Sequence, residues 1–350
     1  MEPSPGQIPL LDLSVAELSS LAASLGEKPF RARQLAAWLF KDGAEDFSAM
    51  TNISRASQAL WAERAFVGPI LELAQTLSSP DGAQKLLFRL PDGLWTESVL
   101  IPEKDHLTLC LSSQVGCPFD CAFCRTGTLG YRRDLSSGEI LGQFLQAQKA
   151  AQGRIRNIVF MGMGEPLLNF PRLAKALAIL SDPTLLARSR KQITVSTVGA
   201  LPGVREMGRL FPQISLAVSL NAPTQSLRRA IMPRAAAAYP LNDLKETLES
   251  HPLPPGRRLT IAYALLKGVN DSLAEARELT RFLAGLKIKI NLIPFNPWPG
   301  APFASPEESA ILRFRDYLAE KNYAVTLRRS KGGAVAGACG QLAGEASLAP

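Results

Sequence analysis

Three of the five cysteines in this 350-residue chain lie close together, in the segment 117-CPFDCAFC-124. The spacing C-x3-C-x2-C places Cys117, Cys121 and Cys124 in one loop. Cysteine thiolates are the ligands of iron–sulfur clusters, and a four-iron cluster held by three thiolates keeps one iron open for another ligand. An open position is typical of catalytic metal centres, whereas structural zinc sites are closed. The pattern therefore predicts a reactive cluster, with a structural zinc knuckle or three small buried side chains as the alternatives.

The rest of the composition narrows the class of protein. Only two histidines are present, His106 and His251, which disfavours an imidazole-rich zinc site or a Ser-His-Asp triad. The cysteine count is odd and no secretory segment precedes the cysteines, so metal or redox chemistry is favoured over a disulfide framework. No apolar run reaches the length of a membrane span. We expect a soluble, cytoplasmic protein with no membrane partner, and its net charge of +8 permits a polyanionic partner.

Three segments of different pattern follow one another along the chain. Residues 1–70 are predicted to form a helical accessory domain, because Ser14 and Glu17 have the spacing of a capping box and further apolar-periodic segments follow. Residues 71–105 are predicted to be a β-rich connector, since two PDG turns separate alternating runs. Residues 106–350 are predicted to be the core domain, which would carry the cysteine loop.

In the core, short β-rich runs alternate with helical patterns, which predicts βα units around a parallel sheet. The number of runs falls short of the eight strands of a closed barrel. The expected fold class is therefore α/β, a partial, open (βα)6 barrel resembling a TIM barrel. In such barrels the site lies at the carboxyl ends of the strands. The expected strands are LTLCLSS, IRNIVFMG, KQITVSTV, QISLAVSL, RLTIAYALL, KIKINLIPF and YAVTLRR.

A second unusual segment, 161-MGMGEPLLN-169, ends the second of these strands. Gly162 and Gly164 would let a ligand approach the backbone closely, and Glu165 could accept a hydrogen bond from an ammonium group. The alternative is an ordinary βα turn with an exposed glutamate. The position after a strand, level with the cysteine loop, favours a binding role.

The two segments together resemble the radical S-adenosylmethionine (AdoMet) superfamily. The resemblance implies that Cys117, Cys121 and Cys124 hold a 4Fe-4S cluster, that its open iron chelates AdoMet, and that electron donation cleaves AdoMet to a 5′-deoxyadenosyl radical. It also implies that the glycine-rich segment contacts the methionine end of AdoMet.

Within the superfamily the chain is similar to the RlmN family, the dual-specificity adenine-C2 methyltransferases that act on 23S ribosomal RNA and on tRNA. The similar segments run in order along nearly the whole chain: FRARQLAAWLF, TLCLSSQVGCPFDCAFC, VFMGMGEPLLN, ITVSTVG, LAVSLNAP, INLIPFNPWPGAPF and ACGQLAG. Carried over position by position, the resemblance implies an AdoMet pocket. Its expected residues are Gly164, Glu165, Ser196, Ser219, Leu220, Asn221 and Asn296.

The resemblance also gives roles to the two remaining cysteines. C2 of adenine is not nucleophilic, whereas a thiolate is a strong nucleophile. In the family's scheme Cys339 takes a methyl group from a first AdoMet. The radical derived from a second AdoMet removes a hydrogen from this methyl group, and the carbon radical adds to adenine C2. Cys110 then attacks Cys339, which releases the methylated base and leaves a transient disulfide.

Two further expectations concern the surroundings of Cys339. Glu97, in WTESVLIPE, matches the family position assigned to the proton acceptor, although a strand glutamate facing solvent is the alternative. Residues 332–344, GGAVAGACGQLAG, contain five glycines and four alanines. This composition suits a mobile loop that moves the thiol into and out of the barrel mouth.

Basic residues recur along the core and would hold RNA phosphates if they surround the barrel mouth, although a solvated surface is the alternative. We expect the target adenine to be flipped into the barrel. The resemblance further implies a monomer and an electron donor such as flavodoxin or ferredoxin. The basic clusters are Arg132 and Arg133; Arg188, Arg190 and Lys191; Arg228, Arg229 and Arg234; Arg257 and Arg258; and Arg328, Arg329 and Lys331.

The chain departs from the family pattern at two positions of interest. Asn221 stands where the family usually has a histidine, so a proton-handling role there is in doubt. Arg125 replaces a small residue after the third cluster cysteine, and its charge is predicted to raise the reduction potential of the cluster. Motifs leave two other functions open: methylation of adenine C8, as in the sister family, and a non-catalytic, metal-stabilised RNA-binding module.

Overall fold

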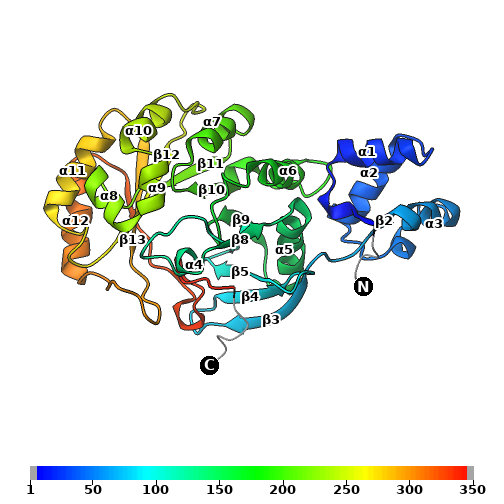
Figure 1. Cartoon of the computed structure of the whole chain (residues 1–350), viewed down its shortest axis with the longest axis horizontal. Coiled ribbons are helices and arrows are strands. Elements are labelled where there is room, and N and C mark those ends of the chain that lie inside the picture. The colour runs from blue at the N-terminus through cyan, green and yellow to red at the C-terminus, as the bar shows by residue number, and fades with distance from the viewer. Residues whose placement is uncertain (1–5, 345–350) are drawn as a thin grey trace.

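A small helical module forms the N-terminal end of the chain in the computed structural model, which describes residues 6–344 (Figure 1). The capping box is confirmed: Ser14 Oγ accepts from Glu17 N at 3.2 Å, and Glu17 Oε2 accepts from Ser14 N at 2.7 Å. Leu18, Leu35 and Trp61 are fully buried in the module. Its elements are β1 (Ile8–Pro9), α1 (Val15–Ser24), α2 (Phe30–Ala36), which continues as a π-helix (Ala37–Lys41), α3 (Arg55–Arg64), and β2 (Ala65–Phe66), which pairs in parallel with β1.

The core contains seven parallel strands in sequence order, as predicted. Within residues 6–344 no ladder joins the two ends of the sheet, so the barrel is open and partial. The strands are β6 (Leu107–Cys110), β9 (Ile155–Phe160), β10 (Ile193–Thr197), β11 (Ser215–Ser219), β12 (Leu259–Leu265), β13 (Ile288–Pro294) and β14 (Val325–Leu327). The helices between them are α5 (Ser137–Ala150), α6 (Phe170–Ser181), α7 (Leu201–Leu210), α8 (Gln225–Ile231), α9 (Pro233–Ala238), α10 (Leu241–Glu249), α11 (Leu273–Leu283) and α12 (Glu308–Glu320).

Three antiparallel strands extend this sheet beyond β6: β3 (Glu72–Ser78), β4 (Gln84–Arg89) and β5 (Trp95–Pro102). The segment that the sequence sets apart as a connector is thus an edge of the core sheet. Its PDG turns place Gly82 and Gly93 at φ of +83° and +80°, where glycine is favoured. The β5–β6 pairing sets Val99 opposite Cys110.

The cysteine loop is enclosed by a short hairpin of β7 (Gln114–Gly116) and β8 (Tyr131–Asp134), with the short helix α4 (Arg125–Thr128) between them. Gly116 has a φ of +74°, and a Cβ atom there would lie 1.8 Å from the carbonyl oxygen of Gly130. Only glycine fits this close crossing. The hairpin therefore fixes where the cysteine loop leaves the sheet and where it returns.

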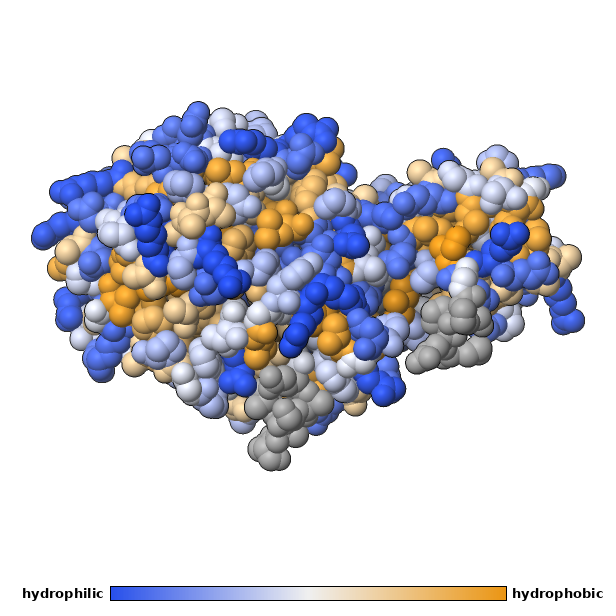
Figure 2. Space-filling model, in the orientation of Figure 1, coloured by the Kyte–Doolittle hydropathy of each residue, from blue (hydrophilic) through white to orange (hydrophobic). Residues whose placement is uncertain are grey.

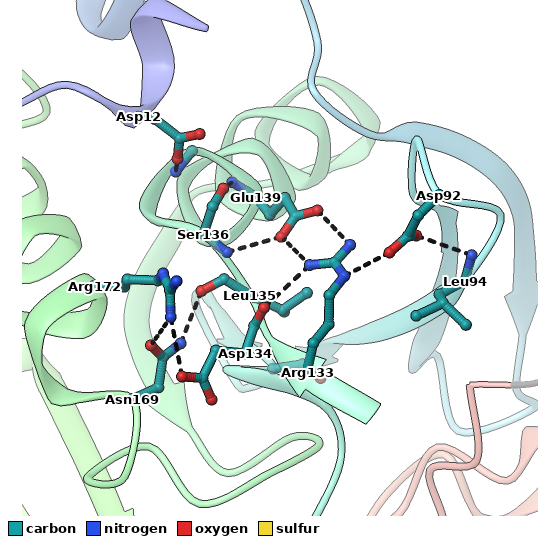
Figure 3. A network of polar contacts seen from close by, with 12 residues as sticks. Asp12, Asp92, Leu94, Arg133, Asp134, Leu135, Ser136, Glu139, Asn169 and Arg172 are labelled. Carbon is teal, nitrogen blue, oxygen red and sulfur yellow. Dashed lines mark hydrogen bonds and ion pairs between the residues drawn. The ribbon is translucent and has the colours of Figure 1, made fainter. Parts of the chain in front are cut away.

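Arg133 fastens the hairpin to the core (Figure 3). Its guanidinium binds both carboxylate oxygens of Glu139 at 2.8 Å and also contacts Asp92 in the β4–β5 turn. Glu139 in turn accepts from Ser136 N in the capping box of α5. At the same helix start, Asp12 of the N-terminal module accepts from Gly138 N at 2.6 Å. One polar network thus links the hairpin, α5 and the N-terminal module.

The surface is mixed in character, with polar side chains interrupted by apolar patches over the face drawn in Figure 2. None of the helices in the described part of the chain is both long enough and apolar enough to cross a membrane.

Replacing Arg133 with methionine should lower the free energy of unfolding by about 2–3 kcal/mol, because a bidentate, charge-assisted contact is lost and the buried Glu139 loses its cation. Chemical denaturation followed by circular dichroism measures the change. The matched control is Arg132→Met on the exposed side of the same strand, for which we expect a change within about 0.5 kcal/mol. Equal effects of the two variants would contradict the role given to the network.

Candidate active site

One cavity of about 180 Å³ lies at the carboxyl ends of the parallel strands. The loops after β6, β9, β10, β11 and β13 all contribute to its wall, as expected of a barrel. Leu220 is the exception among the expected pocket residues, because its side chain is buried in the core instead. Of the residues singled out in the sequence, those that line this cavity are Cys117, Cys121, Cys124, Gly162, Gly164, Glu165, Ser196, Ser219, Asn221, Asn296 and Cys339.

The chemistry of the three loop cysteines fits a cluster. Burial, together with the neighbouring thiols, raises the pKa of Cys117 and of Cys121. Burial also raises the pKa of Cys124, while the backbone N–H groups of Gly127 and Thr126 at the start of α4 oppose that rise. Three crowded, buried thiols become thiolates only if a cationic group binds them. No three His, Cys, Asp or Glu side chains in residues 6–344 could hold a single metal ion, and these thiols instead line a cavity wall.

The two glycines of the MGMGE segment are required by packing. A Cβ atom on Gly162 would lie 2.6 Å from Ser112 Oγ, and one on Gly164 would lie 2.4 Å from Gln114 Cβ. Gly164 also has a φ of +93°. We predicted that these glycines admit a ligand. The structure shows that both glycines make room for the chain segment after β6 and that both also line the cavity.

Glu165 is buried beside the same cavity, contrary to the alternative of an exposed glutamate. Its carboxylate accepts from Val198 N at 2.8 Å and from Leu167 N at 3.1 Å. Burial raises its pKa to about 7, although these hydrogen bonds oppose the rise. A cationic ligand group in the cavity would favour the ionised form.

The other polar residues of the wall are held by hydrogen bonds. Ser196 Oγ lies 3.3 Å from Ser219 Oγ, across the β10–β11 pair. Asn221 adopts a φ of +56°, which asparagine tolerates better than most residues, and its Oδ1 accepts from Ala264 N at 2.9 Å. Asn296 Nδ2 donates to the carbonyl oxygen of Cys339 at 3.0 Å. Hydrogen bonds to backbone groups thus hold the side chains of Asn221 and Asn296 in the cavity wall.

A second cavity, of about 270 Å³, contains Cys110 and Cys339 together. Cys339 and Met161 line both cavities. Burial raises the pKa of Cys110 to about 12, and the charge of Cys339 adds to the rise, whereas Arg328 opposes it. All five cysteines are free in the described residues. Cys339 therefore lies where it can be reached both from the cluster side and from the Cys110 side.

The segment around Cys339 is docked by several hydrogen bonds. Arg125 N donates to Gly340 O at 2.8 Å, and Thr126 Oγ1 donates to Leu342 O at 2.6 Å. Further back, Gly332 N donates to Asp81 Oδ2 at 2.8 Å, and Lys331 Nζ donates to the carbonyl oxygen of Pro102. In Figure 1 this segment (red) passes close to β4 and α4. The structure describes this docked position, and movement of the loop remains a prediction.

Glu97 lies beneath this segment and lines neither cavity. It is fully buried, forms an ion pair with Lys85 at 3.3 Å, and accepts from Ala343 N at 3.1 Å. Burial raises its pKa, while Lys85 opposes the rise. The alternative of a solvent-facing strand glutamate is therefore wrong.

The prediction that the basic clusters hold RNA phosphates is wrong at two positions. Arg228 is 0% exposed, and its guanidinium is turned into the core. Arg133 is occupied by Glu139 and Asp92 (Figure 3). In contrast, Arg328, Arg329 and Lys331 line the second cavity.

Three residues near the two cavities occupy positions that the sequence did not predict. Met161 separates the cavities, Lys85 neutralises Glu97, and Arg228 lies behind the cysteine loop. The place of Met161 at the end of β9 could have suggested its role, because strand ends line such sites. Lys85 and Arg228 are indistinguishable in sequence from surface residues.

Comparison with known proteins agrees with this geometry. A family profile described as the ribosomal RNA large subunit methyltransferase N-terminal domain matches residues 8–67, and one described as the radical SAM superfamily matches residues 111–280. The dual-specificity RNA methyltransferase RlmN of Solidesulfovibrio magneticus is 48% identical over 342 residues, which cover 96% of each chain. The chain belongs to the RlmN family.

Two further relatives support this assignment. The RlmN of Syntrophus aciditrophicus is 43% identical over 97% of both chains. The crystal structure of a radical SAM methyltransferase from Sphaerobacter thermophilus is 39% identical, with a TM-score of 0.89 over 97% of this chain and 100% of that one. The cofactors of this RlmN family member are those of radical SAM proteins, a 4Fe-4S cluster and AdoMet.

The raised pKa of Glu165 predicts a pH dependence of stability in the protein without cofactors. Between about pH 4.5 and pH 7 the folded state keeps a proton that the unfolded state has lost, so the free energy of unfolding falls as the pH rises, by up to about 3 kcal/mol from this group. Glu165→Gln should remove that slope, as measured by denaturation at a series of pH values. An unchanged slope would contradict the burial of an ionisable group here.

Proposed function

We propose that this enzyme methylates C2 of an adenine in 23S rRNA and in tRNA through a methyl group carried by Cys339. The observation that carries the proposal is that Cys339 lines both the cofactor cavity and the cavity of Cys110. A carrier thiol must receive the methyl group on one side and meet the base and the resolving thiol on the other. The position of Cys339 meets both requirements.

On this proposal Cys117, Cys121 and Cys124 hold the cluster, and Glu165 faces the ammonium group of AdoMet. When bound, these cofactors supply the methyl group and the one-electron chemistry. Ser196 and Asn296 complete the wall, and Asn296 also holds the backbone of Cys339. Gly164, Ser219, Leu220 and Asn221 shape the same end of the sheet.

Cys339 and Cys110 then act in turn. The Cys339 thiolate attacks the methyl carbon of AdoMet, so that a new sulfur–carbon bond forms as the sulfonium bond breaks. One hydrogen atom of the methyl group would go to the radical that AdoMet and the cluster supply, the remaining carbon would bond to adenine C2, and the surplus electron of the adduct would return to the cluster. The Cys110 thiolate attacks the sulfur of Cys339, and the bond between that sulfur and the carbon breaks as the disulfide forms. The carbon keeps the electron pair of that bond and takes up a proton to become the methyl group of the base. An external dithiol restores both thiols.

Glu97 is the proposed acceptor of the C2 proton. Its carboxylate is covered in the docked state, because Ala343 N donates to it. The role therefore requires the segment of residues 332–344 to shift when the base enters, which agrees with the glycine-rich composition of the segment. Lys85 opposes the rise in the pKa of this buried carboxylate and so favours its ionised form, the form that can accept a proton.

For the RNA, we infer that a flipped adenine enters the cavity of Cys110 and that Arg328, Arg329 and Lys331 at its wall contact the neighbouring phosphates. A one-electron donor of the flavodoxin or ferredoxin class reduces the cluster. The enzyme acts as a monomer in the cytoplasm, where its RNA substrates are found.

The direct test uses Cys110→Ala. Without the resolving thiol, the base remains bonded to Cys339, so the reconstituted variant should accumulate a protein–RNA adduct when it is given AdoMet, reductant and unmodified RNA. Denaturing electrophoresis and mass spectrometry of the peptide that carries residue 339 detect it. Free 2-methyladenosine should appear only with the wild-type enzyme.

Cys339→Ala is the matched control, and it should give neither adduct nor product. An adduct that persists in Cys339→Ala would contradict the proposed carrier. Release of 8-methyladenosine by the wild-type enzyme would show that it methylates C8 of adenine and not C2. A colourless protein that binds zinc and leaves RNA unchanged would contradict the enzyme function altogether.

A further inference from the structure

Arg228 is a buried cation that the proposed chemistry does not use. Its side chain is 0% exposed, and its guanidinium donates to Leu220 O at 2.8 Å and to Val198 O at 2.6 Å. Within residues 6–344 its Nε has no hydrogen-bond partner, and no carboxylate pairs with it. A buried charge without a counter-charge is costly, so a nearby anion is required to explain its position.

One element close to Arg228 that can supply negative charge is the cysteine loop. The end of α8, which carries Arg228, is joined to this loop by a hydrogen bond from Ala122 N to Ile231 O at 2.9 Å. Met232 packs in one apolar cluster with Cys121, and its Sδ lies 4.0 Å from the Arg228 guanidinium. Arg228 thus contacts a side chain of the same apolar cluster that contains Cys121.

We propose that Arg228 is the fixed counter-charge of the 4Fe-4S cluster and that it raises the reduction potential of the cluster. Reduction adds one electron, taken from a one-electron reductant, to a group already bound by three thiolates. A cation held nearby and away from water stabilises this added negative charge more than it stabilises the oxidised state. Arg228 thereby favours the reduced cluster.

Arg125, the cation that the sequence places next to the cluster, lies differently. Its guanidinium stacks on Trp298 at 5.7 Å and donates to Pro299 O at 3.5 Å. Its side chain therefore contacts the loop after β13, whereas Arg228 contacts Met232, which packs in one apolar cluster with Cys121. Of the two cations, Arg228 is the one excluded from solvent, and its effect is less screened by salt.

A purely structural role is the competing explanation, because the two hydrogen bonds of Arg228 tie together the ends of β10 and β11. The reduction potential separates the two roles, since a strand tie does not by itself change it. The proposal depends on the cluster and not on the product of methylation, so its failure is distinct from failure of the proposed function.

The experiment is a potentiometric titration of the cluster-loaded protein, followed by electron paramagnetic resonance of the reduced cluster. Arg228→Met and Arg228→Gln remove the charge, and Gln keeps a donor for one of the carbonyl groups. At the wild-type midpoint, both variants should show a reduced-to-oxidised ratio at least about tenfold lower, which corresponds to about 59 mV for one electron. Arg228→Lys, which keeps the charge, and Arg229→Met, exposed on the same helix, should match the wild type.

Midpoints of Arg228→Met and Arg228→Gln equal to that of the wild type would overturn the proposal. Thermal melting of the protein without cofactors provides a second readout. There the thiols are neutral and Arg228 has no counter-charge, so removing the cation should leave the melting temperature unchanged or raise it. Failure of both neutral variants to fold without cofactors would mean that Arg228 serves the strands alone, and would overturn the proposal as well.

Discussion

The two cavities and the thiol that they share depend on one constraint: the backbone around Cys339 must be held between the cysteine loop on one side and the edge of the sheet on the other. The hydrogen bonds from Arg125 and Thr126 to the residues after Cys339 fix the first contact. The bond from Gly332 N to Asp81 fixes the second. Because the sheet is open between β14 and β3, this segment can cross the gap and bring a C-terminal thiol to the barrel mouth.

The antiparallel extension of the sheet is part of the same arrangement. Strand β5 lies beside β6, so Glu97 and Cys110 come from neighbouring strands, and the C-terminal segment covers them. The parallel strands contribute the cofactor wall from their carboxyl ends. Two parts of one sheet thus form two cavities, and Cys339 and Met161 are common to both walls. The Lys85–Glu97 ion pair is buried in the antiparallel part of the sheet, beneath the C-terminal segment.

The sequence predicted the features that depend on local pattern. The period of the apolar runs gave the seven parallel strands, and Ser14 with Glu17 gave the start of α1, because these depend on residues close together in the chain. The cysteine loop and the glutamate of the MGMGE segment were placed correctly at strand ends. Contacts between residues far apart in the chain could not be predicted from the sequence. Arg133 and Arg228 both belong to basic runs, but Glu139 fixes the position of Arg133, and the carbonyl oxygen of Val198 helps to fix that of Arg228. The packing that requires glycine at positions 162 and 164 could not be predicted either, because the segment that these residues contact lies fifty residues earlier in the chain.

A methyl relay through Cys339 requires that this thiol shares a cavity with Cys110 in the folded, cluster-loaded enzyme. The most direct measurement is mild oxidation of the anaerobically reconstituted protein with diamide, followed by non-reducing peptide mass spectrometry. A Cys110–Cys339 disulfide should be the main product, with the three cluster cysteines left unpaired. Oxidation that leaves Cys110 unpaired, or that joins Cys339 mainly to Cys124, would contradict the placement of Cys110 and Cys339 in one cavity.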